Sequence, residues 1–125
     1  MKNGISPKRY DLEERTAFFG ENVIKFAKKI PQNPITNPLI IQLVKSGTSI
    51  GANYCEADDA ETGKDFVHKI GICKKEARET KHWLRMIAVA VEDLAVEARK
   101  LRSEANELNL IFNAIAKKIK NRRNI

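Results

Sequence analysis

One line of apolar and small residues runs through the middle of the chain without a missed step. From residue 66 to residue 91 its members recur at alternating intervals of three and four residues. That spacing keeps them on one face of an α-helix and is typical of helices packed lengthwise against one another. The line consists of Phe66, Ile70, Cys73, Ala77, Thr80, Leu84, Ile87 and Val91. So long an amphipathic helix needs helical neighbours to cover its apolar face, which favours an all-α fold.

Three further segments carry lines with the same spacing. The first helix is predicted over about residues 11–30, and its line is Leu12, Thr16, Phe19, Val23, Phe26 and Ile30. The second is predicted over 38–58, with Asn37 as N-cap and Pro38 at the first helical position. Its line is Ile41, Val44, Thr48, Gly51 and Cys55. The fourth, over 95–121, carries Ala98, Leu101, Ala105, Leu108, Phe112, Ile115 and Ile119.

These segments predict one domain. With the third helix placed at 63–91 after a Thr62 cap, residues 11–121 form an antiparallel up-down-up-down four-helix bundle. Residues 1–10 are expected to be a flexible N-terminal arm and residues 122–125 a basic C-terminal tail. A weak break near residues 91–95 separates the last two helices.

The second and third helices carry more apolar residues than one face needs. The second has another line at Leu39, Leu43 and Ile50, with Ser46 and Asn53 interleaved, and Gly47 and Gly51 permit close backbone approach. The third adds Ile72, Trp83, Met86 and Val89. We interpret these aligned extras as a subunit interface, which predicts a homo-oligomer. The alternative is that they cover the edges of a monomeric bundle.

Composition narrows the class of protein. The chain has 125 residues, of which 42% are hydrophobic and 31% charged, as in soluble helical proteins. No apolar run is long enough for a membrane span and the first ten residues do not form a signal peptide, so we expect a cytoplasmic protein without a membrane partner. The net charge of +7 makes an acidic partner such as nucleic acid plausible.

The residues that could support catalysis or metal binding are poorly arranged for it. The Glu-x-x-His element Glu79–His82 and its weaker echo Asp65–His68 lie on one helix, whereas di-iron bundles need such elements on two. His68 and His82 are predicted to face outward, and Cys55 and Cys73 to be small core residues. No phosphate-binding loop or catalytic triad is apparent. The sequence therefore predicts no enzyme activity, no metal and no cofactor.

Two stretches carry a resemblance to a known family. "SGTSIGANYCEA" on the second helix holds a Ser-Ile-x-x-Asn-x-x-Glu pattern at Ser49, Ile50, Asn53 and Glu56. "KDFVHKIGICKKEARETKHWLRMI" holds a Glu-x-x-x-Trp-Leu pattern at Glu79, Trp83 and Leu84. Both resemble the four-helix bundle proteins encoded in intervening sequences of bacterial large-subunit ribosomal RNA genes, which are related to the accessory variability determinant of diversity-generating retroelements.

The resemblance spans about residues 10–120 and implies particular properties. It implies a homo-oligomer, a ring of five, with basic character and no established enzyme activity. Combined with the extra apolar lines, it makes a set of residues candidates for an oligomer interface or for the family motif. The set is Leu43, Ser49, Ile50, Asn53, Glu56, Glu79, Trp83 and Met86.

Two basic groups are the candidate nucleic-acid-binding residues. The first is Lys117, Lys118, Lys120, Arg122 and Arg123, expected at the same end of the bundle as Lys8 and Arg9. The second, along the outer side of the third helix, is Lys74, Lys75, Arg78, Lys81 and Arg85. We interpret them as an RNA- or DNA-binding surface that contacts backbone rather than bases. The alternatives are an ordinary solvated surface and a scaffold that binds an unidentified protein.

Overall fold

The computed structural model describes residues 11–123, and the side chains of residues 11–122. It consists of four α-helices: α1 (Leu12–Ala27), α2 (Thr36–Asp58), α3 (Gly63–Ala90) and α4 (Ala95–Arg123). A short 3-10 turn, Glu92–Leu94, separates α3 from α4, and no strand occurs within these residues. The predicted all-α fold with four helices is therefore confirmed.

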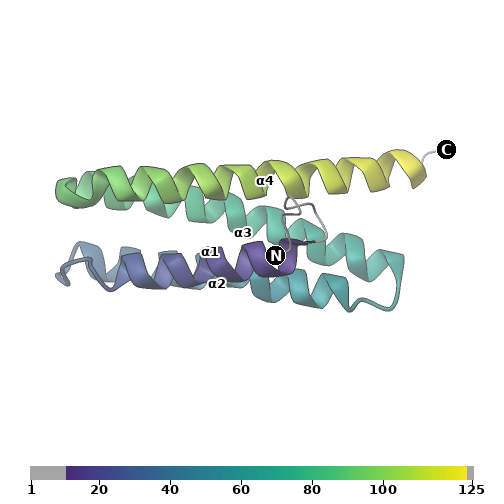
Figure 1. Cartoon of the computed structure of the whole chain (residues 1–125), viewed down its shortest axis with the longest axis horizontal. Helices are drawn as coiled ribbons and strands as arrows, with labels where there is room; N and C mark the ends of the chain where they lie inside the picture. The colour runs from purple at the N-terminus through teal and green to yellow at the C-terminus, as the bar shows by residue number, and fades with distance from the viewer. Residues whose placement is uncertain (1–10, 124–125) are drawn as a thin grey trace.

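The helices lie side by side along one long axis (Figure 1). The α1–α2 and α3–α4 connections lie at one end of that axis, and the α2–α3 connection lies at the other end, near the C-terminus. α3 packs extensively against both α2 and α4, whereas α1 packs mainly against α2 and touches α4 only sparsely. α1 is also the shortest helix, so it covers only part of the bundle's length.

The core contains the apolar lines predicted for three of the four helices. Every member of the first-helix line is buried, from Leu12 to Ile30. The third-helix line is fully buried from Ile70 to Ile87 and half-buried at its two ends. On α4 the buried members are Ala98, Ala105, Leu108 and Phe112.

The core line predicted for the second helix is wrong. The buried residues of α2 are Thr36, Leu43, Ser46, Gly47, Ile50, Tyr54 and Ala57. Ile41 is 64% exposed, and Cys55 is exposed as well, which corrects its predicted place in the core. Leu43 and Ile50, interpreted from the sequence as an extra seam, face the core instead. Since they are completely buried within one chain, they are not available to a subunit interface.

The line predicted as core faces α1, and small residues explain why. A Cβ added to Gly47 would lie 2.9 Å from a methyl carbon of Val23, and one on Gly51 would lie 3.2 Å from Oγ1 of Thr16. These glycines let α1 approach the α2 backbone closely. Helix α2 is thus rotated so that Gly47 and Gly51 meet α1, and the bulkier Leu43 and Ile50 point into the bundle.

Local polar contacts set where two of the helices begin. At α3, Oγ1 of Thr62 accepts a hydrogen bond from the Asp65 N–H at 3.0 Å, as the capping prediction required. At α2, Oδ1 of Asn33 accepts from the N–H groups of both Ile35 and Thr36. The helix therefore starts at Thr36, and the prediction that Asn37 caps it is wrong.

Candidate nucleic-acid interface

Two rows of basic side chains lie along the outer seam between α3 and α4. Two hydrogen bonds fix which sides of these helices meet. Nζ of Lys81 donates to Oδ1 of Asn106 at 2.8 Å, and Nδ2 of Asn109 donates to the Lys74 carbonyl at 2.9 Å. Residues three, four, seven or eleven positions from these four share their helix face. The resulting α3/α4 basic face consists of Lys74, Arg78, Lys81, Arg85, Arg99, Arg102, Lys117 and Lys120.

The cations of this face are open to solvent and unpaired. All are exposed except Lys81, which is half-buried by its bond to Asn106. Within the described part of the chain, the ion pairs involve Arg15, Lys29 and Lys69, none of which is on this face. The positions of the two rows contain no aspartate or glutamate. Their positive charge is therefore not neutralised locally.

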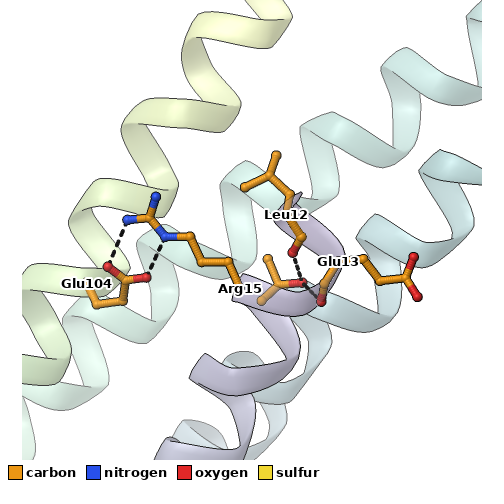
Figure 2. A network of polar contacts seen from close by, with 5 residues as sticks. Leu12, Glu13, Arg15 and Glu104 are labelled. Carbon is orange, nitrogen blue, oxygen red and sulfur yellow. Dashed lines mark hydrogen bonds and ion pairs between the residues drawn. The ribbon is translucent and has the colours of Figure 1, made fainter. Parts of the chain in front are cut away.

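The carboxylates of α4 lie on its other side, toward α1. Arg15 donates two hydrogen bonds to Glu104, at 2.8 and 2.9 Å, across the α1–α4 seam (Figure 2). The bond and the charge of Glu104 raise the pKa of the Arg15 guanidinium, against the effect of its partial burial. Lys29 pairs with Glu97 across the same seam, at 2.9 Å. Helix α4 thus directs its acids to α1, while its bases are divided between the α3 side, at Arg99 and Arg102, and the α1 side, at Lys100.

Helix α3 separates its charges in a similar way. Burial, together with the charge of Glu79, raises the pKa of the Glu76 carboxyl, while Lys75 and Lys45 of α2 lower it. Lys69 of α3 forms an ion pair with Glu56 of α2. These contacts place the acidic side of α3 against α2, away from the basic row. Across the molecule, α1 presents exposed Glu13, Glu14 and Glu21.

The structure separates the basic residues predicted from the sequence into two directions. Lys117 lies eleven positions after Asn106, and Lys120 eleven after Asn109, so both extend the α4 row. Lys118 and Arg122 are exposed but share the side of α4 that carries Glu104, because eighteen residues make five full turns. Helix α4 continues through Arg123, whose side chain lies outside the described residues, as do Lys8 and Arg9.

On α3 the predicted basic group is largely one surface. Lys74, Arg78, Lys81 and Arg85 form the α3 row, and Lys75 is exposed beside it. The sequence interpretation missed Arg99 and Arg102, which the antiparallel register brings opposite Arg85 and Lys81. The signal was present: residues 99, 102, 106, 109, 113, 117 and 120 are all Arg, Lys or Asn at steps of three and four.

The family-motif residues lie on the α2 and α3 sides of the bundle and make mostly local contacts. Oγ of Ser49 donates to the Lys45 carbonyl, and Nδ2 of Asn53 donates to the Ser49 carbonyl. Trp83 is half-buried, with its ring edge-on to His82 at 4.8 Å between centroids. Its Nε1–H is buried without a hydrogen-bond partner. Glu79 and Met86 are half-buried.

The other residues considered for metal binding or catalysis do not lie together in the structure. Among the described residues, no three His, Cys, Asp or Glu side chains are grouped as a metal ion would need. His68 and His82 are both exposed. Cys73 is buried, and burial raises the pKa of its thiol to about 12. None of the described helices is long and apolar enough to cross a membrane.

Comparisons with known proteins agree with the resemblance seen in the sequence. Residues 9–118 match the family described as 23S rRNA-intervening sequence protein. The fold is similar to the crystal structure of a protein of unknown function from the S23 ribosomal protein family of Bacteroides thetaiotaomicron, with a TM-score of 0.75 and 26% identity. That match covers 85% of this chain and 98% of the other. No curated protein matches.

Proposed function

Since the chain belongs to the 23S rRNA-intervening sequence protein family, we propose that it is a non-enzymatic, up-down-up-down bundle that binds nucleic acid through the α3/α4 basic face. The observation that carries this proposal is a row of cations on each of two adjacent helices, with no carboxylate on either row. Such a surface attracts nucleic acid, and each phosphate that a lysine or arginine neutralises releases a cation that had been condensed on the nucleic acid. The 23S rRNA in the family's description makes RNA the first nucleic acid to test.

The distribution of charge over the whole molecule supports the same surface. Exposed acidic side chains gather around the α2–α3 connection and at Glu92 and Asp93 in the turn between α3 and α4, while the two rows themselves carry only positive charge. This asymmetry orients an approaching polyanion toward the basic face before contact. An ordinary solvated helix surface intermixes both signs of charge, as α1 does with Glu21, Lys25 and Lys28.

Neutralising one cation in each row should weaken binding measurably. We expect Arg78→Gln/Arg102→Gln to lower affinity for a structured RNA by about tenfold and the salt slope by about 1 per lost phosphate contact. Fluorescence anisotropy at several salt concentrations measures both. The matched control is Lys25→Gln/Lys28→Gln, which removes the same charge from exposed sites in the last turn of α1 and at its C-cap. Equal losses in the two variants would show that net charge, and not this face, controls binding.

We also propose that the chain assembles as a homo-oligomer, with the ring of five that the resemblance implies. Leu43 and Ile50 are core residues and cannot supply the contact surface, whereas Trp83 and Met86 of the predicted interface set are only half-buried. A shallow groove between α1 and α2 has an apolar floor that includes Ala17, Ile24 and Ala52, and Glu13, Glu14 and Glu21 of α1 line it as well. Ile41 is 64% exposed one heptad before Thr48 and extends this apolar surface. Burial of such side chains against another copy is favourable.

Light scattering of two single variants tests where subunits meet. Ile41→Glu places a charge on the α1/α2 surface, and Val89→Glu places one at a 75%-exposed site on α3, part of the seam first inferred from the sequence. We expect Ile41→Glu to reduce the mass at micromolar concentration to that of the 14.2 kDa chain and Val89→Glu to leave the oligomer intact. If Val89→Glu gave the monomer and Ile41→Glu did not, the interface would lie on the α3 seam. If the unmodified protein were itself a monomer, the proposed assembly would be refuted.

The same apolar surface supports a second candidate function, that of a protein-binding scaffold with no nucleic-acid role. Pull-downs after nuclease treatment discriminate the two. Recovery of one stoichiometric protein that Ile41→Glu abolishes and Arg78→Gln/Arg102→Gln does not would favour the scaffold. Loss of all partners on nuclease treatment would favour nucleic-acid binding.

A further inference from the structure

The α3/α4 basic face offers charge without any stacking platform. The aromatic residues of the described region are Phe18, Phe19, Phe26, Tyr54, Phe66, Trp83 and Phe112, and none is at a position of either row. Trp83 is two positions from Lys81, which puts it on a different side of α3, where its ring packs against the core cluster. Surfaces that bind single strands combine a basic groove with aromatic side chains on which successive bases stack. This face lacks the second component.

The face is also long and straight. From Arg99 to Lys120 the α4 row spans about 32 Å at about 1.5 Å per residue, and packed helix axes lie about 8–10 Å apart. The Lys81–Asn106 and Asn109–Lys74 hydrogen bonds hold the rows in register. A full turn of duplex is about 34–36 Å long. The α4 row therefore matches one turn of B-form DNA in length, whereas the α3 row, from Lys74 to Arg85, spans about 16 Å, or half a turn.

We infer that the basic face binds the phosphates of double-helical nucleic acid in preference to a single strand. The inference rests on the proposed nucleic-acid binding and adds the form of the ligand. A duplex presents its phosphates already ordered, whereas a single strand must lose conformational freedom to follow a straight row. Stacking worth about 1–3 kcal/mol per base would have to offset that loss, and this face does not provide it. A duplex also releases more counterions for each phosphate that is neutralised. The slope of log affinity against log salt changes by about 0.9 per phosphate for a duplex and by about 0.7 for a single strand.

The absence of stacking groups also bears on whether affinity depends on the base sequence of the nucleic acid. The side chains of the face are lysines, arginines and asparagines along the sides of two antiparallel helices. Asn106 and Asn109 are already bonded to α3. Contacts to phosphate fix position but do not read sequence. Affinity should therefore be insensitive to the order of bases in the duplex.

Anisotropy with matched oligonucleotides tests the inference on the full chain. The probes are RNA and DNA duplexes of about two turns, or about 20 base pairs, and each of their component strands, chosen to be unstructured. We expect each duplex to bind at least about tenfold more tightly than its own strands at the same salt, with a steeper salt slope. Scrambling the duplex sequence should change affinity by less than about twofold.

The outcomes separate this inference from the function on which it rests. Strands that bind as tightly as the duplexes would overturn the duplex preference and leave phosphate binding by the basic face intact. A strong dependence on duplex sequence would overturn the expected insensitivity to base order, because the face would then be reading bases. No binding to any probe at low salt would refute the proposed function itself. Arg78→Gln/Arg102→Gln should weaken duplex binding, and Lys25→Gln/Lys28→Gln should not.

Discussion

Replacing Gly47 with leucine is expected to destabilise the bundle by about 3 kcal/mol, since overpacking a well-filled core costs about 1–3 kcal/mol and occasionally more. The first added carbon alone would lie 2.9–3.2 Å from three carbons of Val23, which is itself completely buried. Gly47→Ala should also destabilise, despite a gain of about 1 kcal/mol in helix propensity. Urea unfolding followed by circular dichroism measures the free energy of unfolding for each variant.

Two further variants show whether the Val23 contact is the cause. On a Val23→Ala background, Gly47→Ala should become neutral or stabilising, because the two methyl carbons at 2.9 and 3.0 Å are gone and only the Cβ at 3.2 Å remains. At Gly20 a Cβ would be 3.6–3.8 Å from its nearest neighbours on α2, an ordinary contact distance. Gly20→Ala should therefore stabilise by about 0.5–1 kcal/mol. Destabilisation by Gly20→Ala as large as that by Gly47→Ala would contradict this account of the α1–α2 contact.

Stability should fall steeply above about pH 9 because of Cys73. The pKa of its buried thiol is raised from 9.0 to about 12, chiefly by desolvation. Above pH 9 the unfolded chain has lost this proton while the folded chain retains it. The contribution is thus complete below pH 9 and is lost as pH rises toward 12, at about 1.4 kcal/mol per pH unit. Urea unfolding between pH 8 and 11 measures that slope.

The matched variants isolate the thiol from other groups that titrate in alkali. Cys73→Ala should have a flatter dependence of unfolding free energy on pH, whereas Cys55→Ser should keep the original slope, because Cys55 is exposed. Thiol labelling gives an independent reading. In the folded protein Cys55 should react rapidly and Cys73 only at the rate at which the chain opens. An unchanged slope in Cys73→Ala would rule out this thiol as the source.

Periodicity predicted the helices well where one line of residues dominated. The lines on the first, third and fourth helices needed only the helical repeat and a bulky residue at most steps. Helix α2 carries two lines at the same spacing, and periodicity cannot rank them. Which one faces the core was decided by Gly47 and Gly51, whose lack of a side chain lets α1 come close. That choice depends on a partner helix and is therefore not contained in the local pattern.

The candidate site was harder to predict for a related reason. The sequence grouped cations that are near one another in the chain, so Lys117 to Arg123 looked like one patch. In the helix, Lys117 and Lys120 point along the α3 seam, while Lys118 and Arg122 share the α1 side with Glu104. Arg99 and Arg102 join the Lys74–Arg85 row only through the register of α3 against α4. The Lys81–Asn106 contact that fixes this register joins residues 25 positions apart.

The close α1–α2 contact and the α3/α4 basic face share no side chain, and this separation bears on how the molecule can vary. Val23, Gly47 and Gly51 determine how firmly the short helix is held, and Arg78 and Arg102 lie on other helices. Changes at distant sites without common partners combine additively. Mutations that change how firmly α1 is held would therefore leave the charge of the basic face unchanged. The stability of the α1–α2 contact and the charge of the α3/α4 basic face can therefore change independently of each other.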